Sequence, residues 1–507
     1  MALRVGRRRL LGISAIIVLL LLLSASVTVV LVVRGSLAVL DGERALAGLT
    51  GPVEIARDRL GVPDIQAESR TDAARALGYL HAQDRFFQMD LQRRSAAGEL
   101  AELMGPGVVN IDRDVRVHQF RRRAQGIMGG LPVQQRSLLD AYAEGVNAGL
   151  DDLRVRPFEY LVLRQQPARW LPEDSILTLH AMFLDLSLSS ATYEATCSAV
   201  RDHLPEALVE LFLPWGNPWN APLQSGGENV IAIPDSSAVD VRDWKFGDRT
   251  WREFREEHGE TAHHDKAGSN NFAIAGPLSA HGGSIVANDM HLGHRLPNIW
   301  YRARMSWPEG SGRRALVGVT LPGTPALVVG SNGQVAWGFT NTMGDWADLV
   351  VLEFESSRST RYRTPEGWRE LEREPERIEV AGSTPDTLWV EKTIWGPVWD
   401  TDADGRRRAL RWTAHDAEAV NLELIRMETA ANVDEVLSIA GRLGIPAQNL
   451  VCGDSAGRIA WVLAGRIPRR EGWDGRTSVS WADGGHAWTG YVNPRENPRV
   501  VDPPHGH

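Results

Sequence analysis

The sequence predicts an α+β protein with a helical front part, a strand-rich back part and an apolar N-terminal segment. From about residue 133 to 213 apolar residues recur at helical spacing, whereas from Ser269 onward short apolar runs alternate with turn residues. Helices followed by strands, without strict alternation, are typical of the α+β class. The chain has 507 residues, of which 43% are hydrophobic and 23% charged. This composition supports a large core and excludes a disordered chain or a disulfide-stapled miniprotein.

The N-terminus carries a segment long enough to cross a membrane. Residues 10–33 contain no charge, and a helix of that length reaches about 36 Å against a hydrocarbon core of about 30 Å. Arginines are concentrated in residues 1–9, and only Arg34 follows closely. The positive-inside rule therefore predicts a cytoplasmic tail, a single transmembrane anchor and an extracytoplasmic remainder. A cleaved signal segment ending near Ala38, with a secreted product, is the alternative.

Residues 40–220 form the mainly helical part. Residues 51–58 alternate apolar and polar side chains and predict a strand, and the turn Gly61-Val62-Pro63 follows it. Ser69, with Asp72 three residues later, predicts the start of a long helix. Residues 221–268 lose this regularity and hold scattered charges, so they predict an exposed connector or spacer.

Residues 269–507 are predicted to be strand-rich, with one helix over about 417–443. The expected strands share short apolar runs bounded by glycine or polar residues. They lie at residues 271–275, 284–288, 326–330, 335–338 and 349–352.

Charge argues against nucleic acid as a partner, and cysteine content argues against a zinc cage built from cysteines alone. The formal net charge is −9 and no basic stripe stands out, so nucleic acid is not an expected partner. Cys197 and Cys452 are too few to build a zinc cage. Outside the membrane they could pair or remain separate thiols, and the sequence leaves both open.

Two serines compete for the role of nucleophile. Ser455 lies in Gly453-Asp454-Ser455-Ala456-Gly457, which matches the nucleophile elbow of α/β-hydrolases. That elbow requires a helix after the serine, whereas strand-like runs flank this motif on both sides, which favours a hairpin turn. An α/β-hydrolase esterase built on Ser455 is therefore the remote alternative.

Ser269 lies where the connector ends and an apolar strand begins. Its hydroxyl could attack the Gly268 carbonyl and cleave the Gly268–Ser269 bond by an N→O acyl shift. The freed α-amino group, with a pKa of about 7.7–8.0, could then serve as the base for the same residue's hydroxyl. A plain Gly-Ser loop before a strand is the structural alternative.

The order of several motifs resembles the penicillin acylase family of N-terminal-nucleophile amidohydrolases. The resemblance runs from about residue 51 onward and no single motif decides it. The matching stretches are Gly61-Val62-Pro63, Asp72-Ala73, the run from Gly78 to Asp90, Ser269-Asn270-Asn271-Phe272, Asn288-Asp289-Met290-His291-Leu292, Gly330 to Gly333, Trp337-Gly338 and Gly344 to Asp348.

The resemblance implies a four-layer αββα sandwich and autocatalytic maturation of one precursor into an α chain and a β chain that form a heterodimer. Residues 269–507 would be the N-terminal part of the β chain. Because relatives continue well beyond this length, the resemblance also implies a C-terminally truncated, incomplete β chain.

Carried over by position, the resemblance implies five catalytic residues. Ser269 would be the nucleophile, and the backbone N–H of Asn341 and the side chain of Asn449 would form the oxyanion hole. His291 would lie beside the nucleophile. Arg470 would hold Asn449 and the terminal amine in place.

The resemblance also implies one structural Ca²⁺ ion and an acyl pocket. Asp345, the carbonyl of Ala347, Asp348 and Glu194 would supply the hard oxygen ligands that Ca²⁺ prefers. Leu292 and Val329 stand where the best-known penicillin-binding member has aromatic pocket residues, which is consistent with an aliphatic acyl group.

These observations predict a membrane-anchored hydrolase that cleaves linear amide bonds of small N-acyl amides. Its substrates would be of the type cleaved by penicillin, cephalosporin or acyl-homoserine-lactone acylases. A truncated, catalytically inactive, membrane-anchored paralogue is the main alternative, and cleavage at Gly268–Ser269 separates the two.

Overall fold

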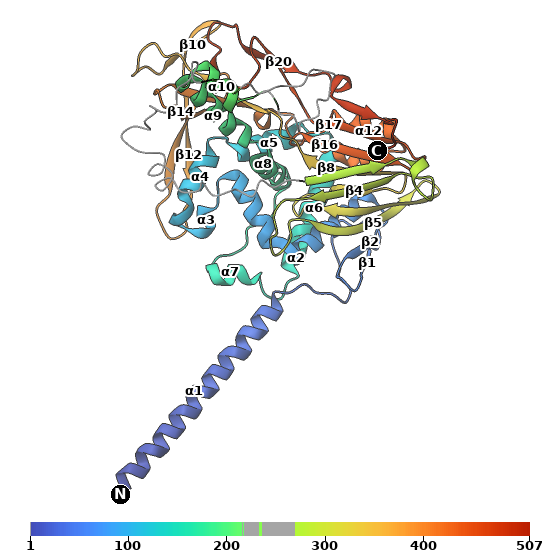
Figure 1. Cartoon of the computed structure of the whole chain (residues 1–507). Helices are drawn as coiled ribbons and strands as arrows, with labels where there is room; N and C mark the ends of the chain where they lie inside the picture. The colour runs from blue at the N-terminus through green and yellow to red at the C-terminus, as the bar shows by residue number, and fades with distance from the viewer. Residues whose placement is uncertain (1, 215, 217–232, 236–268) are drawn as a thin grey trace.

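A computed structural model describes residues 2–214, 216, 233–235 and 269–507 (Figure 1). Most of the connector expected at 221–268, and with it the Gly268 side of the expected cleavage point, lies outside the described residues. The described chain has a helical front part and a strand-rich back part. The α+β prediction is therefore confirmed.

The first helix, α1 (Ala2–Gly35), projects away from the body of the protein (Figure 1). Its segment Leu10–Gly35 is strongly apolar, with a mean hydropathy of 3.1. None of the residues in its most apolar stretch of 18 is buried. By length and composition this segment is a candidate membrane span, as a signal sequence would also be.

Two long helices, α2 (Arg70–Ala97) and α6 (Val133–Asp151), pack closely against each other. Ser69 caps α2 by accepting a hydrogen bond from Asp72 N at 3.0 Å, which confirms the predicted helix start. A Cβ atom on Gly78 would lie 2.3 Å from the Tyr142 carbonyl oxygen, so this close approach requires glycine. The other helices of this part are α3 (Ala101–Met104), α4 (Val109–Arg116), α5 (Phe120–Gly130), α7 (Phe158–Leu163), α8 (Asp174–Leu186), α9 (Ser189–His203) and α10 (Glu206–Phe212).

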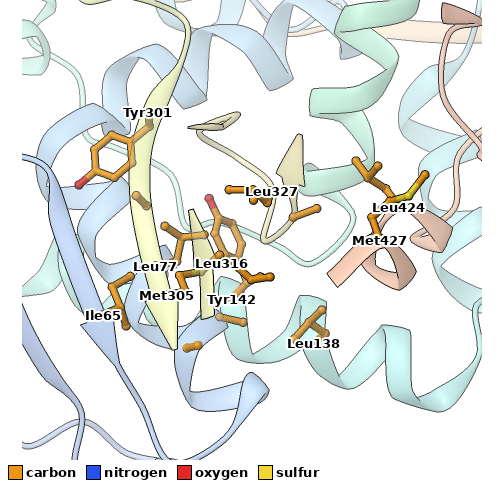
Figure 2. Close-up of a cluster of buried hydrophobic side chains, with 14 of the residues drawn as sticks. Ile65, Leu77, Leu138, Tyr142, Tyr301, Met305, Leu316, Leu327, Leu424 and Met427 are labelled. Atoms are coloured by element: carbon orange, nitrogen blue, oxygen red, sulfur yellow. The ribbon is translucent and has the colours of Figure 1, made fainter. Parts of the chain in front are cut away.

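A nine-stranded sheet forms the centre of the back part. Its core lies on the side of α2 and α6, where Leu77, Tyr142 and Met305 meet (Figure 2). In spatial order its strands are β1 (Glu54–Arg57), β2 (Pro63–Gln66), β5 (Tyr301–Glu309), β6 (Gly312–Thr320), β7 (Leu327–Ser331), β8 (Val335–Asn341), β16 (Gln448–Asp454), β17 (Ile459–Ala464) and β21 (Arg499–Val501).

A hairpin of β3 (Ser269–Ile274) and β4 (Ile285–Met290) contacts β8 and β16 of this sheet. Side chains alternate along β16: Leu450 and Cys452 join the large core, whereas Val451 packs with Ala273 of the hairpin. The hairpin and the large core therefore lie on opposite faces of β16.

The remaining strands form smaller sheets. The four-stranded sheet has the order β14 (Val398–Thr401), β15 (Arg407–Trp412), β9 (Ala347–Val351) and β19 (Val479–Ser480). Three two-stranded sheets pair β10 (Arg361–Thr364) with β11 (Gly367–Glu370), β12 (Glu372–Ile378) with β13 (Asp386–Lys392), and β18 (Pro468–Glu471) with β20 (Ala487–Tyr491).

The single helix predicted over 417–443 is wrong. The structure has a short 3₁₀ segment, η5 (Glu423–Glu428), followed by α12 (Val433–Ala440). Asn432 separates them because its backbone is extended and its side chain accepts a hydrogen bond from Glu435 N. An asparagine N-cap starts a new helix, so the apolar periodicity on both sides does not belong to one continuous helix.

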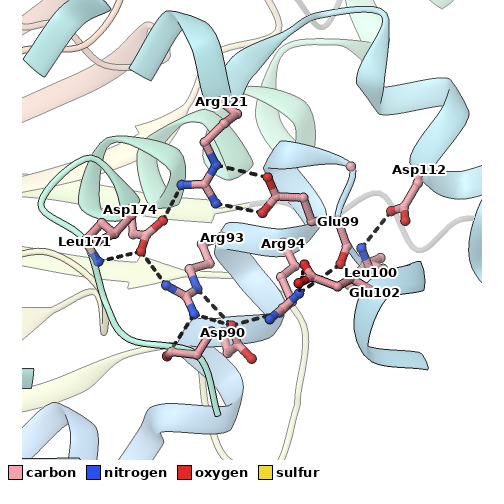
Figure 3. Close-up of polar contacts among 12 residues, drawn as sticks. Asp90, Arg93, Arg94, Glu99, Leu100, Glu102, Asp112, Arg121, Leu171 and Asp174 are labelled. Atoms are coloured by element: carbon pink, nitrogen blue, oxygen red, sulfur yellow. Dashed lines mark hydrogen bonds and ion pairs between the residues drawn. The ribbon is translucent and has the colours of Figure 1, made fainter. Parts of the chain in front are cut away.

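A buried ion-pair network ties α2 to α5 and α8 (Figure 3). Asp90 Oδ1 accepts hydrogen bonds from Arg93 Nε at 2.8 Å and from Arg94 Nε at 2.9 Å. Arg93 also pairs with Asp174, which accepts from Arg121 Nη1 at 2.6 Å. Asp90 and Asp174 are fully buried, and each has more than one cationic partner.

Three buried histidines meet between α5, α8 and the 3₁₀ segment η4 (Thr413–His415). His118 Nδ1 lies 3.1 Å from His415 Nε2, and the ring of His180 stacks on Phe120 with centroids 4.4 Å apart. Burial, and secondarily the nearby Arg123, lowers the pKa of His118 and of His180 to about 3. All three rings are therefore neutral at physiological pH.

Both cysteines, Cys197 and Cys452, are buried and free. Of the two possibilities left open by the sequence, the structure has the separate thiols.

Candidate functional site

The β3–β4 hairpin places Ser269 beside the residues that follow β4. Ser269 is the first residue of β3 and pairs with Met290, the last residue of β4. His291 N donates a hydrogen bond to Ser269 Oγ at 3.1 Å. The predicted proximity of Ser269 and His291 is therefore present, and it is made by the main chain of His291.

The imidazole of His291 pairs with a carboxylate near the end of β4. His291 Nε2 lies 2.8 Å from Asp289 Oδ2, and the side chains are 45% and 76% exposed, respectively. Such an exposed pair contributes little to stability. His291 is not among the residues that line the cavity next to Ser269.

The hairpin is held against β8 at a point of close backbone approach. Asn288 Nδ2 donates to the Phe339 carbonyl at 2.9 Å. A Cβ atom on Gly338 would lie 2.8 Å from Asn288 Cβ. Glycine at 338 is thus what lets the strand carrying Asn288 lie on β8, and this contact fixes the position of Ser269.

Asn341 and Asn449 come together through the pairing of β8 with β16. Gln448 is opposite Asn341, and Asn449 is opposite Thr340. Asn449 Nδ2 donates to the Asn341 carbonyl at 3.1 Å, while Asn449 Oδ1 accepts from Trp461 Nε1 at 3.1 Å. These bonds fix the orientation of the amide, and its Nδ2 group has a second hydrogen to donate.

Ser269 and Asn341 line one apolar cavity of about 90 Å³. Asn341 Nδ2 donates to the Leu186 carbonyl at 3.1 Å, so α8 forms one wall. The expected Leu292 lines the cavity, but Val329 does not, and its neighbour Val328 does. Successive residues of a strand face opposite sides of the sheet. Because Val328 faces the cavity, Val329 faces away from it, and its predicted place in the acyl pocket is wrong. Further apolar lining comes from Met182, Leu186, Met290, Trp300, Leu321 and Phe339.

Arg470 lies in a second, acidic cluster. Its Nε donates to Asp348 Oδ2 at 2.9 Å and its Nη2 forms an ion pair with Asp345 Oδ2 at 3.0 Å. Trp488 also donates to Asp348. Among the described residues, the hydrogen bonds of Arg470 go to these aspartates and not to Asn449. The resemblance instead implied that Arg470 would hold Asn449 and the terminal amine.

Glu194 reaches the same cluster from α9. Its Oε2 accepts from Leu349 N at 2.9 Å. Burial, then the neighbouring carboxylates of Asp348 and Asp345, raises the pKa of Glu194. Burial likewise raises the pKa of Asp345, against the opposing charge of Arg470. The cluster therefore gathers three carboxyl groups, two of which form ion pairs with Arg470.

The donor chemistry of this cluster suits a hard cation. Glu194 Oε1 and Asp345 Oδ1 are buried and accept no hydrogen bond. Across residues 2–214, 216, 233–235 and 269–507, however, no three His, Cys, Asp or Glu side chains converge in the arrangement of a metal site. The cluster therefore offers unpaired ligand oxygens, with Arg470 already bound to two of the carboxylates.

Ser455 lies on a turn between β16 and β17, which pair as an antiparallel hairpin. It is exposed, and its Oγ lies 3.5 Å from Gln334 Oε1. A strand and not a helix follows, so the turn interpretation is confirmed and the nucleophile elbow is absent from this segment.

Several residues that build the site were not predicted. Asn288 and Gly338 carry the docking of the hairpin, and both lie inside motifs that the sequence had already marked. Gln448, which donates to Asn341 Oδ1 at 3.1 Å, and Met182 of α8 gave no sequence signal, because only strand register and helix packing bring them to the cavity.

Known proteins resemble this chain over most of its length. The chain is 30% identical to the penicillin acylase 2 proenzyme of Pseudomonas sp. (strain SE83), over 93% of this chain and 60% of the relative. It is 28% identical to the acyl-homoserine lactone acylase QuiP of Pseudomonas aeruginosa, over 93% of this chain and 56% of the relative. For the penicillin G acylase of Escherichia coli the identity is 26%, over 90% and 58%.

The chain therefore spans between 56% and 60% of the length of these relatives. Among solved structures, a thermostable penicillin G acylase from Alcaligenes faecalis aligns with a TM-score of 0.42 and 26% identity, over 47% of this chain and 43% of that one. The family model described as penicillin amidase matches residues 52–507. The chain thus belongs to the penicillin amidase family.

Proposed function

We propose that this chain is an N-terminal serine amidohydrolase that cleaves the linear amide bond of a small N-acyl amide after cleavage of its own Gly268–Ser269 bond. The contact that carries this proposal is the hydrogen bond from His291 N to Ser269 Oγ, because Ser269 and Asn341 line the same apolar cavity. A hydroxyl beside an apolar cavity is an arrangement suited to acyl transfer, and Asn449 is bound to the main chain of Asn341, which lines that cavity.

In the proposed reaction Ser269 Oγ attacks the substrate carbonyl while the free α-amino group of the same residue accepts the hydroxyl proton. The second hydrogen of Asn449 Nδ2 and the main-chain N–H of Asn341 would stabilise the oxyanion. The carbon–nitrogen bond breaks, the amine leaves with a proton, and water then hydrolyses the acyl ester.

Mass spectrometry of the full-length protein tests this proposal. The wild-type chain should give two chains, the C-terminal one beginning Ser-Asn-Asn-Phe, and Ser269→Ala should give one. Ser455→Ala is the matched control, since an exposed turn serine should not affect processing. A wild-type chain that folds but remains whole would favour the alternative, an inactive membrane-anchored paralogue.

We propose that the complete fold is the four-layer αββα sandwich. Support comes from three successive layers: helices α2 and α6, the nine-stranded sheet, and the β3–β4 hairpin on the opposite face of β16. Self-cleavage would divide this arrangement between an α chain and a β chain that remain associated.

We propose that the acidic cluster binds one structural Ca²⁺ ion. Glu194, Asp345 and Asp348, with the Ala347 carbonyl, would hold it, and the ion would neutralise charge that Arg470 alone does not. Its role would be to join α9 to β9, with no part in the reaction. Support comes from the unpaired oxygens Glu194 Oε1 and Asp345 Oδ1.

Thermal unfolding tests the calcium proposal. Ca²⁺ at about 100 times its Kd should stabilise the protein by about 2.7 kcal/mol, and Mg²⁺ should not. Glu194→Gln should abolish this shift, because it removes a charged ligand while keeping an acceptor for Leu349 N. Asp483→Asn, at an exposed site, is the control. Equal Ca²⁺ shifts in all three proteins would refute the site.

We propose that α1 anchors the protein in the cell membrane with the body outside, the alternative being a secreted protein whose segment is removed. Support comes from the apolar segment Leu10–Gly35, which lies largely outside the body of the protein, and from the arginines before it. N-terminal sequencing of the native protein distinguishes a retained anchor from a start near Val39.

A further inference from the structure

A large groove lies on the side of the body where α1 ends. Its volume is about 1200 Å³, and it runs along α2 and past the segment Ser36–Ala38 that directly follows α1. Figure 1 shows α1 meeting the body beside α2 and α7. If α1 spans a bilayer, this groove therefore opens close to the membrane surface.

One side chain, Met182, lines both this groove and the catalytic cavity. Along α8, Leu179 and Leu186 face the cavity, whereas Leu184 and Asp185 face the groove. The chain before β5 divides in the same way: Ile299 lines the groove and Trp300 the cavity. The cavity and the groove are thus separated by α8 and by the short segment before β5. Met182 lines both the cavity and the groove.

The partition is adjustable at Met182. Methionine is unbranched, with several rotatable bonds, and fills irregular gaps in more than one rotamer. The other groups at this place, Ile299 and Leu321, are shorter and packed around it. Met182 is therefore the residue whose movement would bring the cavity and the groove into contact.

Volume decides which acyl groups need that movement. A cavity of about 150 Å³ holds benzene, whereas the catalytic cavity measures about 90 Å³. By that comparison the cavity alone accepts a chain on the order of four carbons. A longer chain attached to a carbonyl at Ser269 has to leave the cavity, and the groove is the adjoining space.

The groove has both apolar walls and unpaired polar atoms. Phe87, Leu91 and Phe158 contribute apolar surface. Gln88 Oε1 and Gln92 Nε2, one turn apart on the same face of α2, are buried without hydrogen-bond partners. An aliphatic tail would cover the apolar wall, and the two amides could bind an oxygen substituent on it.

We propose that the groove binds the aliphatic tail of a long-chain N-acyl amide, with Met182 as the gate between the tail and the reacting carbonyl. The inference rests on the proposed amidohydrolase function and on the proposed anchor. The tail reaches the groove from the bilayer, because the groove opens where α1 enters the body and the apolar side chains of Leu37 and Leu40 line its exposed rim.

Binding to the Ser269→Ala protein, full length and in phospholipid nanodiscs, tests the groove without requiring catalysis. The probes are N-dodecanoylglycinamide and N-butanoylglycinamide, followed by titration calorimetry. Gln92→Trp should obstruct the groove and weaken dodecanoyl binding at least about tenfold, about 1.4 kcal/mol, while butanoyl binding stays unchanged. Ser95→Trp, also in the groove, is the second variant.

Val162→Trp is the matched control, because Val162 is exposed on α7 and does not line the groove. Equal weakening of both probes by Gln92→Trp and Ser95→Trp, or of neither, would overturn the inference. Since the readout is binding, it remains informative even for a chain that is never processed, so the two proposals fail separately.

A second arm tests the source of the tail. Wild-type protein should bind dodecanoyl probe faster when the probe is in its own nanodisc than when cyclodextrin delivers it through water. Equal rates by both routes would overturn the bilayer route.

Discussion

Replacing His180 by phenylalanine should remove part of the protein's sensitivity to acid. The His180 ring is completely buried and stacked on Phe120, beside His118 and His415. Burial lowers the pKa of His180 to about 3, against about 6.5 in an unfolded chain. Phenylalanine has nearly the same shape and cannot take up a proton.

The sign follows from proton binding. Between pH 6.5 and pH 3 the unfolded chain binds a proton at this residue and the folded chain does not, so stability falls as pH falls. With these pKa values, one such histidine costs about 2 kcal/mol at pH 5 and almost nothing at pH 8, at 1.36 kcal/mol per pKa unit. His180→Phe should therefore gain about 2 kcal/mol over wild type on going from pH 8 to pH 5.

Urea unfolding in nanodiscs, followed by tryptophan fluorescence at several pH values, measures this difference. His203→Phe is the control, because His203 is exposed at the end of α9 and is not part of the buried histidine cluster. The quantity to compare is the free energy of unfolding of His180→Phe minus that of wild type. If this difference changes by less than about 0.5 kcal/mol between pH 8 and pH 5, His180 does not remain neutral in the folded protein.

Three further substitutions test the site. Asn449→Ala should keep the fold and, in processed enzyme, lower kcat by about 10²–10³, the loss typical of one oxyanion donor; turnover under saturating substrate measures it, and an unchanged kcat would remove Asn449 from the reaction. Gly338→Ala should destabilise the protein by about 1–3 kcal/mol, because the new Cβ would lie 2.8 Å from Asn288; urea titration measures it, and Gly333→Ala, in open space, reports the cost of a glycine turn alone. Ser455→Ala should leave hydrolysis of an ester or amide probe unchanged, and loss of activity would contradict its assignment to a turn.

Local signals in the sequence predicted much of the fold. The Ser69 cap, the strand pair that begins at Ser269 and the turn at Ser455 all depend on residues close together in the chain. The leading family motif has a packing role: Gly78 allows α2 to touch α6, and Asp90 anchors the buried ion pairs.

Contacts that depend on tertiary packing were not predictable. Arg470 binds Asp345 and Asp348 across a separation of 122 residues between Arg470 and Asp348, which no local pattern encodes. The choice of Val328 over Val329 at the cavity depends on strand register, and the histidine cluster draws on three separate segments. The position of Met182 between the cavity and the groove depends on the packing of α8, which the sequence does not indicate.

The pairing of β8 with β16 has a consequence for how this chain can vary. Asn341 and Asn449 are held in place by cross-strand pairing, while some hundred residues between them form an excursion through smaller sheets and hairpins. Insertions or deletions in that excursion, for example near the exposed β11, leave the alignment of the two asparagines untouched. A single residue added inside β16 would instead turn Asn449 to the opposite face. Length differences among homologues should therefore concentrate between β9 and β16. They should be absent within β8 and within β16.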